Sequence, residues 1–588
     1  MTEFDASLPV TIDGNRFDID IEKFSWSPIA SLRQATDQAA EPGEQSLLPS
    51  SLWKRTRGNF KIGAGQDYAD EPGDSDELRF SASRGIDPWD QRKLELLADT
   101  ELKRATSTTS GKLIPVDDRV YWLDGGTIRH DTTPGGSGGF SSTVTGSGDV
   151  DINQYGNKIV ACDGSDTWTI SDGTRSALGT DPCDMLVYGN GRLIAGHDNE
   201  LFEIDGAGVK ATMWSHPNTD FAWKGGVAAP NGIYVYGTAG ATSEIYFVGI
   251  DDASTALFAP FTAAPLTPNE EVFCLYHYGG TIVIGTSRGF RLANIAGSGH
   301  LSYGPLIAVG AVRAFAGDGE DLWFTWTNFD ASYTGLGRSR LDKGSDILVP
   351  RYATDVMAAT QGTVLGACSY GDQRYFMVSG VGLYGTTTDK VATGWYNSGW
   401  VTYGTPELKE LHSLDVRHEP LPAGSSVVGK IVKEDLSEST IVTSSVTAAV
   451  GLASSVSPRL ALEQAQVRIE LARGTDTTTT PEFRRWTLRA VPLPYKQSAF
   501  VLPLRVVSQV SGPRGQAIRN NALTVWNLIR GLETAREVIT VTIGDFSVEA
   551  RIDGIGFNPG DAIGWSRAQQ FLEGTMMVRF ETAQPLGS

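Results

Sequence analysis

The sequence predicts a mainly β protein organised around a seven-bladed β-propeller. An extended N-terminal arm is expected before the propeller, and a β-sandwich and a small α+β C-terminal domain after it. Three observations lead to this prediction: a hairpin pattern that recurs through the middle of the chain, alternating strands after residue 386, and one amphipathic helical stretch near the end.

The recurring unit is a short β-rich run, a polar turn containing Gly or Asp, and a second β-rich run. Asn-Gly, Gly-Gly and Asp-Gly pairs supply the positive φ angles of tight hairpin turns. The spacing of roughly 33 to 53 residues brackets the length of a four-stranded propeller blade, and about seven units fit. An array of sandwiches is the competing architecture, but it gives no reason for the same hairpin in nearly every unit. The repeats are VDDRVYWLDG from Val116, QYGNKIVACDG from Gln154, VYGNGRLIAGHD from Val187, APNGIYVYGT from Ala229, HYGGTIVIGTSRG from His277, AGDGEDLWFTW from Ala316 and SYGDQRYFMVSG from Ser369.

Large or β-branched residues occupy the second run of each hairpin. Such side chains pack well on pleated surfaces, so we expect them between neighbouring blades. They are Tyr121, Trp122, Ile159, Ile194, Tyr234, Ile282, Trp323 and Phe376.

The regions outside the repeats differ in character and give four expected domains. Residues 1–108 lack periodicity but contain Trp53, Phe60, Phe80 and Trp89, so the arm should order by lying against this chain's propeller or a neighbouring subunit. Residues 109–390 form the propeller and residues 391–494 the sandwich. Residues 495–588 form the α+β domain, whose helix presents Leu523, Trp526, Leu528, Ile529 and Leu532 on one face.

Charge and hydropathy exclude several functions. The formal net charge of −20 opposes the phosphate contacts that drive nucleic-acid binding. No apolar run is long enough to span a membrane, and the start MTEFDASLPVTIDG has no secretory signal, so we expect synthesis in a host cytoplasm. The four cysteines lie far apart without C-x-x-C spacing, which favours structural thiols over a zinc site or a disulfide framework.

Motifs that could carry chemistry are weak. The G-x-S-x-G matches around Ser137 and Ser287 lie in a glycine loop and between two strands, whereas a hydrolase nucleophile needs a strand-to-helix turn. Gly63 and Gly65 are followed by Tyr68 where a dinucleotide fingerprint requires a third Gly, and the acidic run over residues 70–77 would repel phosphate.

Metal sites have equally little support. The acidic turn with Asp318, Glu320 and Asp321 lacks the spacing of a calcium loop. No H-x-H or H-E-x-x-H pattern occurs among the histidines, which are His130, His197, His216, His277, His300, His412 and His418. We therefore expect no catalytic residue, no cofactor and no metal ligand, and predict that the protein is not an enzyme.

Several short pieces near the N-terminus resemble minor tail proteins of long-tailed phages that infect actinobacteria. Each piece is short, but their order and spacing together are unlikely by chance, and the resemblance extends through WVTYGTPELKELHSLDV and the final α+β unit. The matching pieces are EPGEQSLLP over residues 41–49, LWKR over 52–55, GAGQDYAD over 63–70 and GIDPW over 85–89.

The resemblance implies a structural subunit of the virion, at the tail tip of a siphophage-like particle. It implies contacts with neighbouring tail proteins through the arm and the C-terminal domains, several copies per virion, and attachment to the host surface. It supplies no catalytic residue. The alternative is a carbohydrate-binding or cell-wall glycan-degrading protein, in which Trp395 and Trp400 stack on sugar rings or propeller carboxylates act as acid and base.

Overall fold

The computed structural model describes most of the chain, and its described part is mainly β. α1 (Ala522–Ala535) is the one α-helix among the described residues, and no described helix is long and apolar enough to cross a membrane. The described residues are 9–19, 25–30, 53–60 and 80–582, except 107, 109–110, 117, 132–141, 145, 251–256, 308, 342–349, 404–407, 448–449, 493–495, 507–508, 512–516, 520–521, 536–538, 544–545 and 560–573.

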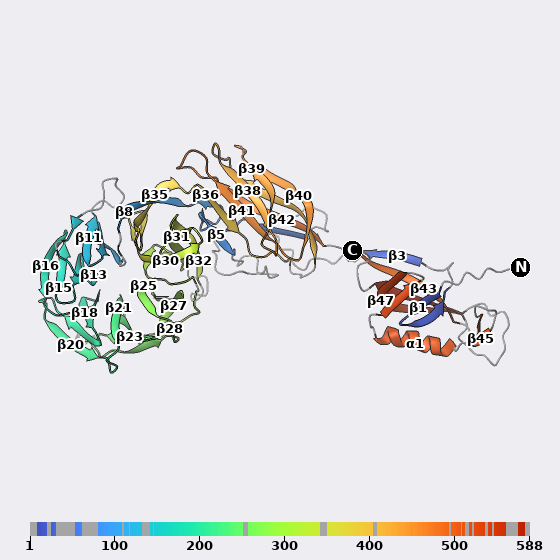
Figure 1. Cartoon of the computed structure of the whole chain (residues 1–588), viewed down its shortest axis with the longest axis horizontal. Coiled ribbons are helices and arrows are strands. Elements are labelled where there is room, and N and C mark those ends of the chain that lie inside the picture. Colours follow the sequence, from blue (N-terminus) through green and yellow to red (C-terminus); the bar gives the residue numbers. More distant parts are fainter. Residues whose placement is uncertain are drawn as a thin grey trace.

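Seven four-stranded antiparallel sheets follow one another through the middle of the chain, and Figure 1 shows them arranged around a ring. In chain order their strands are β9 (Leu113–Val116), β10 (Arg119–Asp124), β11 (Thr127–Asp131) and β12 (Ser142–Thr143); β13 (Asp151–Tyr155), β14 (Lys158–Cys162), β15 (Thr167–Ser171) and β16 (Thr174–Gly179); β17 (Met185–Gly189), β18 (Arg192–His197), β19 (Glu200–Ile204) and β20 (Lys210–Ser215); β21 (Ala222–Ala229), β22 (Gly232–Ala239), β23 (Thr242–Gly249) and β24 (Phe261–Pro265); β25 (Val272–Tyr278), β26 (Thr281–Thr286), β27 (Phe290–Ile295) and β28 (Leu301–Tyr303); β29 (Phe315–Asp318), β30 (Asp321–Asp330), β31 (Tyr333–Arg340) and β32 (Arg351–Ala358); and β33 (Val364–Tyr370), β34 (Gln373–Val378), β35 (Gly382–Lys390) and β8 (Ala98–Ala105).

The repeated hairpin of the sequence joins the first two strands of each sheet. In the third sheet Gly189 pairs with Arg192, so Asn190 and Gly191 form the two-residue turn. Their φ angles are +54° and +76°, the left-handed values that Asn and Gly tolerate best.

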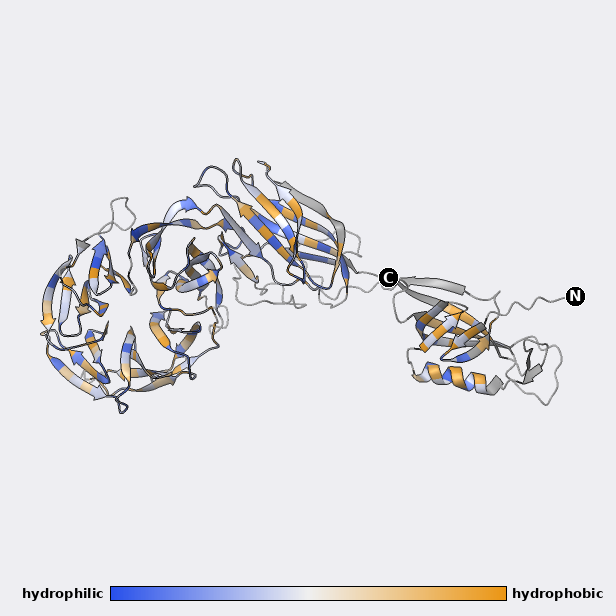
Figure 2. Cartoon of the chain, viewed as in Figure 1, coloured by the Kyte–Doolittle hydropathy of each residue, from blue (hydrophilic) through white to orange (hydrophobic). Residues whose placement is uncertain are grey.

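Hydrophobic clusters lie between each sheet and the next. One cluster combines Leu113 and Trp122 of the first sheet with Tyr375 and Met377 of the seventh, so the series closes on itself. The eight large or β-branched residues expected between blades are all buried within clusters of this kind. The sheets and their packing define a β-propeller-like fold, and Figure 2 shows hydrophobic residues distributed through the strands of every sheet.

The seventh sheet takes its fourth strand from before the first. β8 pairs antiparallel with β35, and Gly382 faces Ala105 in the register. Because β8 precedes β9 in the chain, this pairing links the seventh sheet to the start of the first sheet. It also gives β35 a paired strand on the side that would otherwise be an open sheet edge.

Two further sheets share one hydrophobic core, which we call the two-sheet unit. Trp53 and Phe80, from early in the chain, are buried there beside Tyr396, Phe483 and Trp486. One sheet has the order β39-β38-β41-β36-β5 and the other the order β4-β42-β37-β40, with a small β6-β7 ladder beside them. The strands are β4 (Trp53–Arg57), β5 (Ala82–Arg84), β6 (Ile86–Asp87), β7 (Glu95–Leu96), β36 (Thr393–Asn397), β37 (Lys409–His418), β38 (Ser426–Val432), β39 (Glu438–Ser444), β40 (Val450–Leu462), β41 (Gln466–Ala472) and β42 (Phe483–Pro492).

A seven-stranded sheet covered on one face by α1 forms the third unit, the helix-backed sheet. Ile529 of α1 is fully buried in its core, and Val525, Trp526, Leu528 and Leu532 pack around it; the side chain of Leu523 lies outside the described set. The strand order is β2-β1-β46-β47-β48-β43-β3, with β44 (Gln509–Ser511) and β45 (Ala517–Arg519) paired separately. The strands are β1 (Pro9–Ile12), β2 (Asn15–Asp18), β3 (Ser25–Ala30), β43 (Lys496–Val506), β46 (Ile539–Ile543), β47 (Phe546–Pro559) and β48 (Gly574–Thr582).

The chain is therefore nested. β1 and β3 pair with strands of residues 496–582, β4 and β5 pair with strands of residues 393–492, and β8 completes the ring. The expected arm of residues 1–108 is not one separate segment in its described parts, because backbone pairing distributes it over three units. The expected boundaries at residues 108, 390 and 494 stay predictions.

Candidate interdomain site

Residues 80–89 run between the two-sheet unit and the sixth sheet of the ring. β5 pairs with β36, while the hydroxyl of Thr354 on β32 donates to the carbonyl oxygen of Ser83. Ala353 and Met357 of β32 are buried in the core of the two-sheet unit, so this core continues onto the ring. Gly85, with φ +67°, fits here because a Cβ would lie 2.7 Å from the carbonyl oxygen of Thr393.

Arg84 adds an ion pair across this boundary. Its Nη1 donates to Asp330 Oδ2 at 2.7 Å, and its guanidinium carbon lies 4.9 Å from the ring centroid of Tyr333. On the other side it lies 5.8 Å from the ring of Trp395, which also carries Arg468 at 4.3 Å. An arginine stacked on aromatic faces and paired with a carboxylate gains both cation–π and ionic stabilisation.

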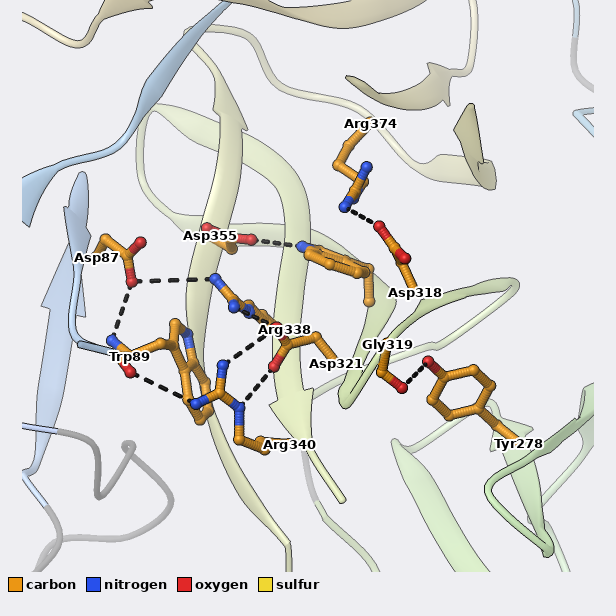
Figure 3. Close-up of polar contacts among 11 residues, drawn as sticks. Asp87, Trp89, Tyr278, Asp318, Gly319, Asp321, Arg338, Arg340, Asp355 and Arg374 are labelled. Atoms are coloured by element: carbon orange, nitrogen blue, oxygen red, sulfur yellow. Dashed lines mark hydrogen bonds and ion pairs between the residues drawn. The ribbon is translucent and has the colours of Figure 1, made fainter. Parts of the chain in front are cut away.

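A second set of contacts, shown in Figure 3, involves Trp89 and two arginines of β31. Arg340 Nε and Nη2 donate to the two oxygens of Asp321 at 2.8 and 3.2 Å, and its Nη1 donates to the Trp89 carbonyl oxygen at 3.4 Å. Arg338 also donates to Asp321 and lies 3.9 Å from Asp87. The guanidinium carbons of Arg338 and Arg340 lie 5.4 and 5.3 Å from the Trp89 ring, so the indole is covered by both cations.

The contacts continue behind Arg338 into the seam with the seventh sheet. Trp323 Nε1 donates to Asp355, and the Trp323 ring lies 5.3 Å from Arg338 and 4.2 Å from Arg374. Arg374 in turn donates to Asp318 at 2.7 Å. We call this connected set of Asp87, Trp89, Asp318, Asp321, Trp323, Arg338, Arg340, Asp355 and Arg374 the arginine clasp.

The pKa values of the two buried carboxyl groups of the clasp, Asp355 and Asp321, are shifted in opposite directions. Burial raises the pKa of Asp355 to about 6, against the opposing charge of Arg338. Burial would also raise the pKa of Asp321, but hydrogen bonds from Arg340 and Arg338 outweigh it and lower that pKa. Burial disfavours the charged form of Arg338 as well, and the carboxylates of Asp355 and Asp321 more than compensate, so its pKa is raised.

Two carboxylates with opposite pKa shifts resemble the acid and base of a glycosidase. In the clasp, however, the Asp321 oxygens accept from two guanidinium groups and Asp355 accepts from an indole. Asp355 is 6% exposed and Asp321 9% exposed. A substrate would have to displace these partners to reach either group, so the arrangement fits a structural contact between units.

The acidic turn considered above as a calcium loop contributes Asp318 and Asp321 to the clasp. Asp318 is paired with Arg374, and Asp321 is paired with Arg338 and Arg340. Arginine side chains therefore occupy the positions beside these carboxylates where a calcium ion would bind.

Ser287 lies in the turn between β26 and β27, where its hydroxyl accepts from the Glu271 backbone N–H at 3.2 Å, away from any strand-to-helix elbow. Gly63, Gly65, Tyr68, Ser137 and the acidic run 70–77 fall outside the described residues.

One histidine does meet two carboxylates. His197 Nδ1 lies 2.9 Å from Asp184 Oδ2, and its Nε2 lies 3.8 Å from Asp198 Oδ2. This group could not be predicted from the sequence, because Asp184 precedes β17, whereas His197 ends β18 and Asp198 follows it. All three side chains are at least one-third exposed, and the carboxylates lie against different ring nitrogens, which suits an ion pair better than a common metal ligand set.

The carbohydrate-binding alternative requires Trp395 and Trp400 to stack on sugar rings. Trp395 is half-buried under Arg468 and Arg84 at the boundary between the units, and Trp400 is also half-buried.

The arginines of the clasp were not predicted from the sequence. Their spacing in GRSR was the available signal, because residues two apart on a strand share a face.

The fold and the clasp together define a β-propeller-like protein with additional β units. No family model and no curated protein matches the sequence. Among solved structures, the WD40 domain of Neurospora crassa Pan2 is similar with a TM-score of 0.35 and 10% identity, over 51% of this chain and 98% of that one. BamB from Moraxella catarrhalis gives 0.31 and 11%, over 49% and 98%. The computationally designed Ika8 protein gives 0.34 and 13%, over 55% and 99%.

Proposed function

We propose that this chain is a structural minor tail protein of a siphophage-like virion, located at the tail tip. In this proposal the seven sheets are the blades of a closed seven-bladed propeller, the two-sheet unit is a β-sandwich, and the helix-backed sheet is an α+β assembly domain. The protein connects neighbouring tail proteins and presents the propeller toward the host surface, without enzymatic activity.

The observation that carries the proposal is the nested path of the chain. The chain passes from the helix-backed sheet to the two-sheet unit after residue 30 and returns after residue 492. It passes from the two-sheet unit to the ring after residue 97 and returns after residue 390. Two covalent segments therefore cross each boundary between units. They divide a pulling force between them, and they restrict rotation of one unit relative to the next more than a single linker would.

The arginine clasp supports the same role. Arg84 and the Trp89 cluster add ionic and cation–π contacts where the two-sheet unit meets the ring. A subunit that transmits force along a particle needs rigid units joined by such contacts. The matching pieces of the N-terminal region include GIDPW, which supplies Asp87 and Trp89 of the clasp.

The position of the chain in a particle tests the proposal. Antibodies against the purified propeller region would be used to label virions from a phage that encodes this chain, with detection by immunogold electron microscopy. We expect label at the distal end of the tail. Label on the capsid or along the tail tube, or particles that lack the protein, would overturn the proposal.

A further inference from the structure

Two of the four cysteines lie together at the seam between the second and third sheets of the ring. Cys162 ends β14, and Cys183 lies two residues before β17. Both are fully buried in one hydrophobic cluster with Val160, Leu186 and Phe202. Each carries a free thiol in this structure.

The strand register places the two cysteines on either side of Thr167. Cys162 faces Thr167 across the β14–β15 ladder, and the Thr167 hydroxyl lies 3.8 Å from Cys183 Sγ. A side-chain interaction with Cys183, together with burial, raises the pKa of Cys162 far above its usual range. The sequence separation concealed this pairing, because a whole hairpin, β15–β16, lies between the two residues.

We propose that Cys162 and Cys183 form a disulfide that joins the second and third sheets when the chain folds under oxidising conditions. With oxidised glutathione, a Cys162 or Cys183 thiolate attacks the glutathione disulfide and releases one reduced glutathione. The second protein thiol then loses its proton, attacks the mixed disulfide, and releases the second glutathione. Two protein thiols are oxidised and one glutathione disulfide is reduced to two thiols.

Folding is the stage at which this bond forms. Thiolate is the reacting species, and external oxidants cannot reach the folded pair because both thiols are fully buried; the pKa of Cys162 is also raised. Before the two sheets pack, both thiols are exposed and have ordinary acidity. The bond closes a short loop over residues 163–182, so it restricts the unfolded chain as well as stapling the seam.

The remaining cysteines provide an internal control. Cys274 lies on β25 of the fifth sheet and Cys368 on β33 of the seventh, in different hydrophobic clusters. Burial raises the pKa of each thiol to about 12. Cys368 is buried and Cys274 is partly buried, and neither has a thiol neighbour in its cluster among the described residues, so oxidation should leave them reduced.

The test compares the full chain produced in a reducing cytosol with the same chain refolded in a buffer of reduced and oxidised glutathione. Thiols are counted with Ellman's reagent after denaturation, and non-reducing peptide mapping locates any bond. We expect four thiols in the reduced protein and two after oxidation, a mass lower by two hydrogens, and one linked peptide pair containing Cys162 and Cys183. The midpoint of thermal unfolding should rise by roughly 5 °C.

Variants separate the pair from the other thiols. The double variant Cys274→Ser, Cys368→Ser should still lose two thiols on oxidation, whereas Cys183→Ala should lose none. If oxidative refolding gives no soluble protein, export to an oxidising bacterial periplasm supplies the oxidised sample. Four free thiols in soluble oxidised protein, or a bond that involves Cys274 or Cys368, would overturn the proposal. Neither result depends on the proposed place of the protein in a virion.

Discussion

Arg84 on β5 and Asp330 at the end of β30 form a 2.7 Å ion pair between residues 246 positions apart in the chain. The pair spans the boundary between the two-sheet unit and the ring. Both side chains are about one-quarter exposed, so solvent weakens the attraction without abolishing it.

A double-mutant cycle with Arg84→Ala and Asp330→Ala should give a coupling free energy of about 1 kcal/mol, because the two charges face each other directly. Chemical denaturation of the wild type, both single variants and the double variant measures it. The Arg192–Glu203 pair, at 2.6 Å and similarly exposed, lies within the third sheet and serves as control. Only loss of Arg84–Asp330 should speed proteolysis at the boundary. A coupling that stays at zero in low salt would contradict the role of this pair.

Asp355 gives the clasp a pH dependence opposite to that of an ordinary carboxylate. Its folded pKa of about 6 lies above the ordinary 3.8, so the folded state binds its proton more tightly than the unfolded state. This contribution to the free energy of unfolding is fully present below pH 3.8 and is lost as the pH rises through 6. Relative to Asp355→Asn, wild-type stability should therefore fall by on the order of 2 kcal/mol from pH 4.5 to pH 7.

Urea denaturation of both proteins at several pH values measures this difference. Asp321 acts with the opposite sign, because its lowered pKa gives stability above its unfolded pKa that is lost as the pH falls through the folded value. The comparison with Asp355→Asn cancels that contribution. Parallel stability curves for the two proteins would show that the pKa of Asp355 is the same in the folded and unfolded states, which would contradict the prediction.

Trp395 distinguishes packing at the boundary from sugar binding. Arg468 and Arg84 cover its ring, so Trp395→Ala should remove two cation–π contacts and cost about 2 kcal/mol of stability. Trp400→Ala, in the same stretch, is the control. A glycan array should give the same result for wild type and variant. Loss of a wild-type glycan signal with unchanged stability would favour the carbohydrate-binding alternative.

Gly366 tests the closure of the ring between its seventh and first sheets. A Cβ at this position would lie 1.6 Å from the carbonyl oxygen of Gly111, so the backbones could not keep their present distance. Gly366→Ala should cost about 3 kcal/mol, measured by thermal unfolding. Gly206→Ala, whose added Cβ meets no described atom within 4 Å, should change stability by less than about 0.5 kcal/mol. Equal midpoints for the two variants would argue against a tight closure.

Val10 tests whether the first strands are part of the helix-backed sheet. It is fully buried against that core and pairs with Ile543, whereas the neighbouring Thr11 points to the other face. Val10→Asp should destabilise this unit by about 4 kcal/mol and expose residues 496–582 to protease, with the ring intact. Thr11→Asp should have little effect. Limited proteolysis with mass spectrometry measures both, and unchanged protection in Val10→Asp would contradict the pairing.

Much of the local structure could be predicted from the sequence. Asn190-Gly191 and its counterparts define hairpin turns through their own φ preferences, and α1 follows from the spacing of its apolar residues. The clasp could not be predicted, because Trp89, Arg340 and Asp355 lie in separate parts of the chain and meet only after the sheets pack. The Cys162–Cys183 contact escaped prediction for the same reason.

The mainly β character, the repeated hairpins, the helix and the residues buried between sheets follow from local sequence patterns, since turn chemistry and hydrophobic alternation act over a few residues. The positions of the described strands among the first hundred residues depend on the packing of the rest of the chain. Among the described strands, β3, β4 and β8 pair with no strand close in sequence, and their backbone groups are satisfied by β43, β42 and β35, hundreds of residues away. Such long-range pairing depends on the edges that the rest of the fold leaves open, which no local pattern encodes.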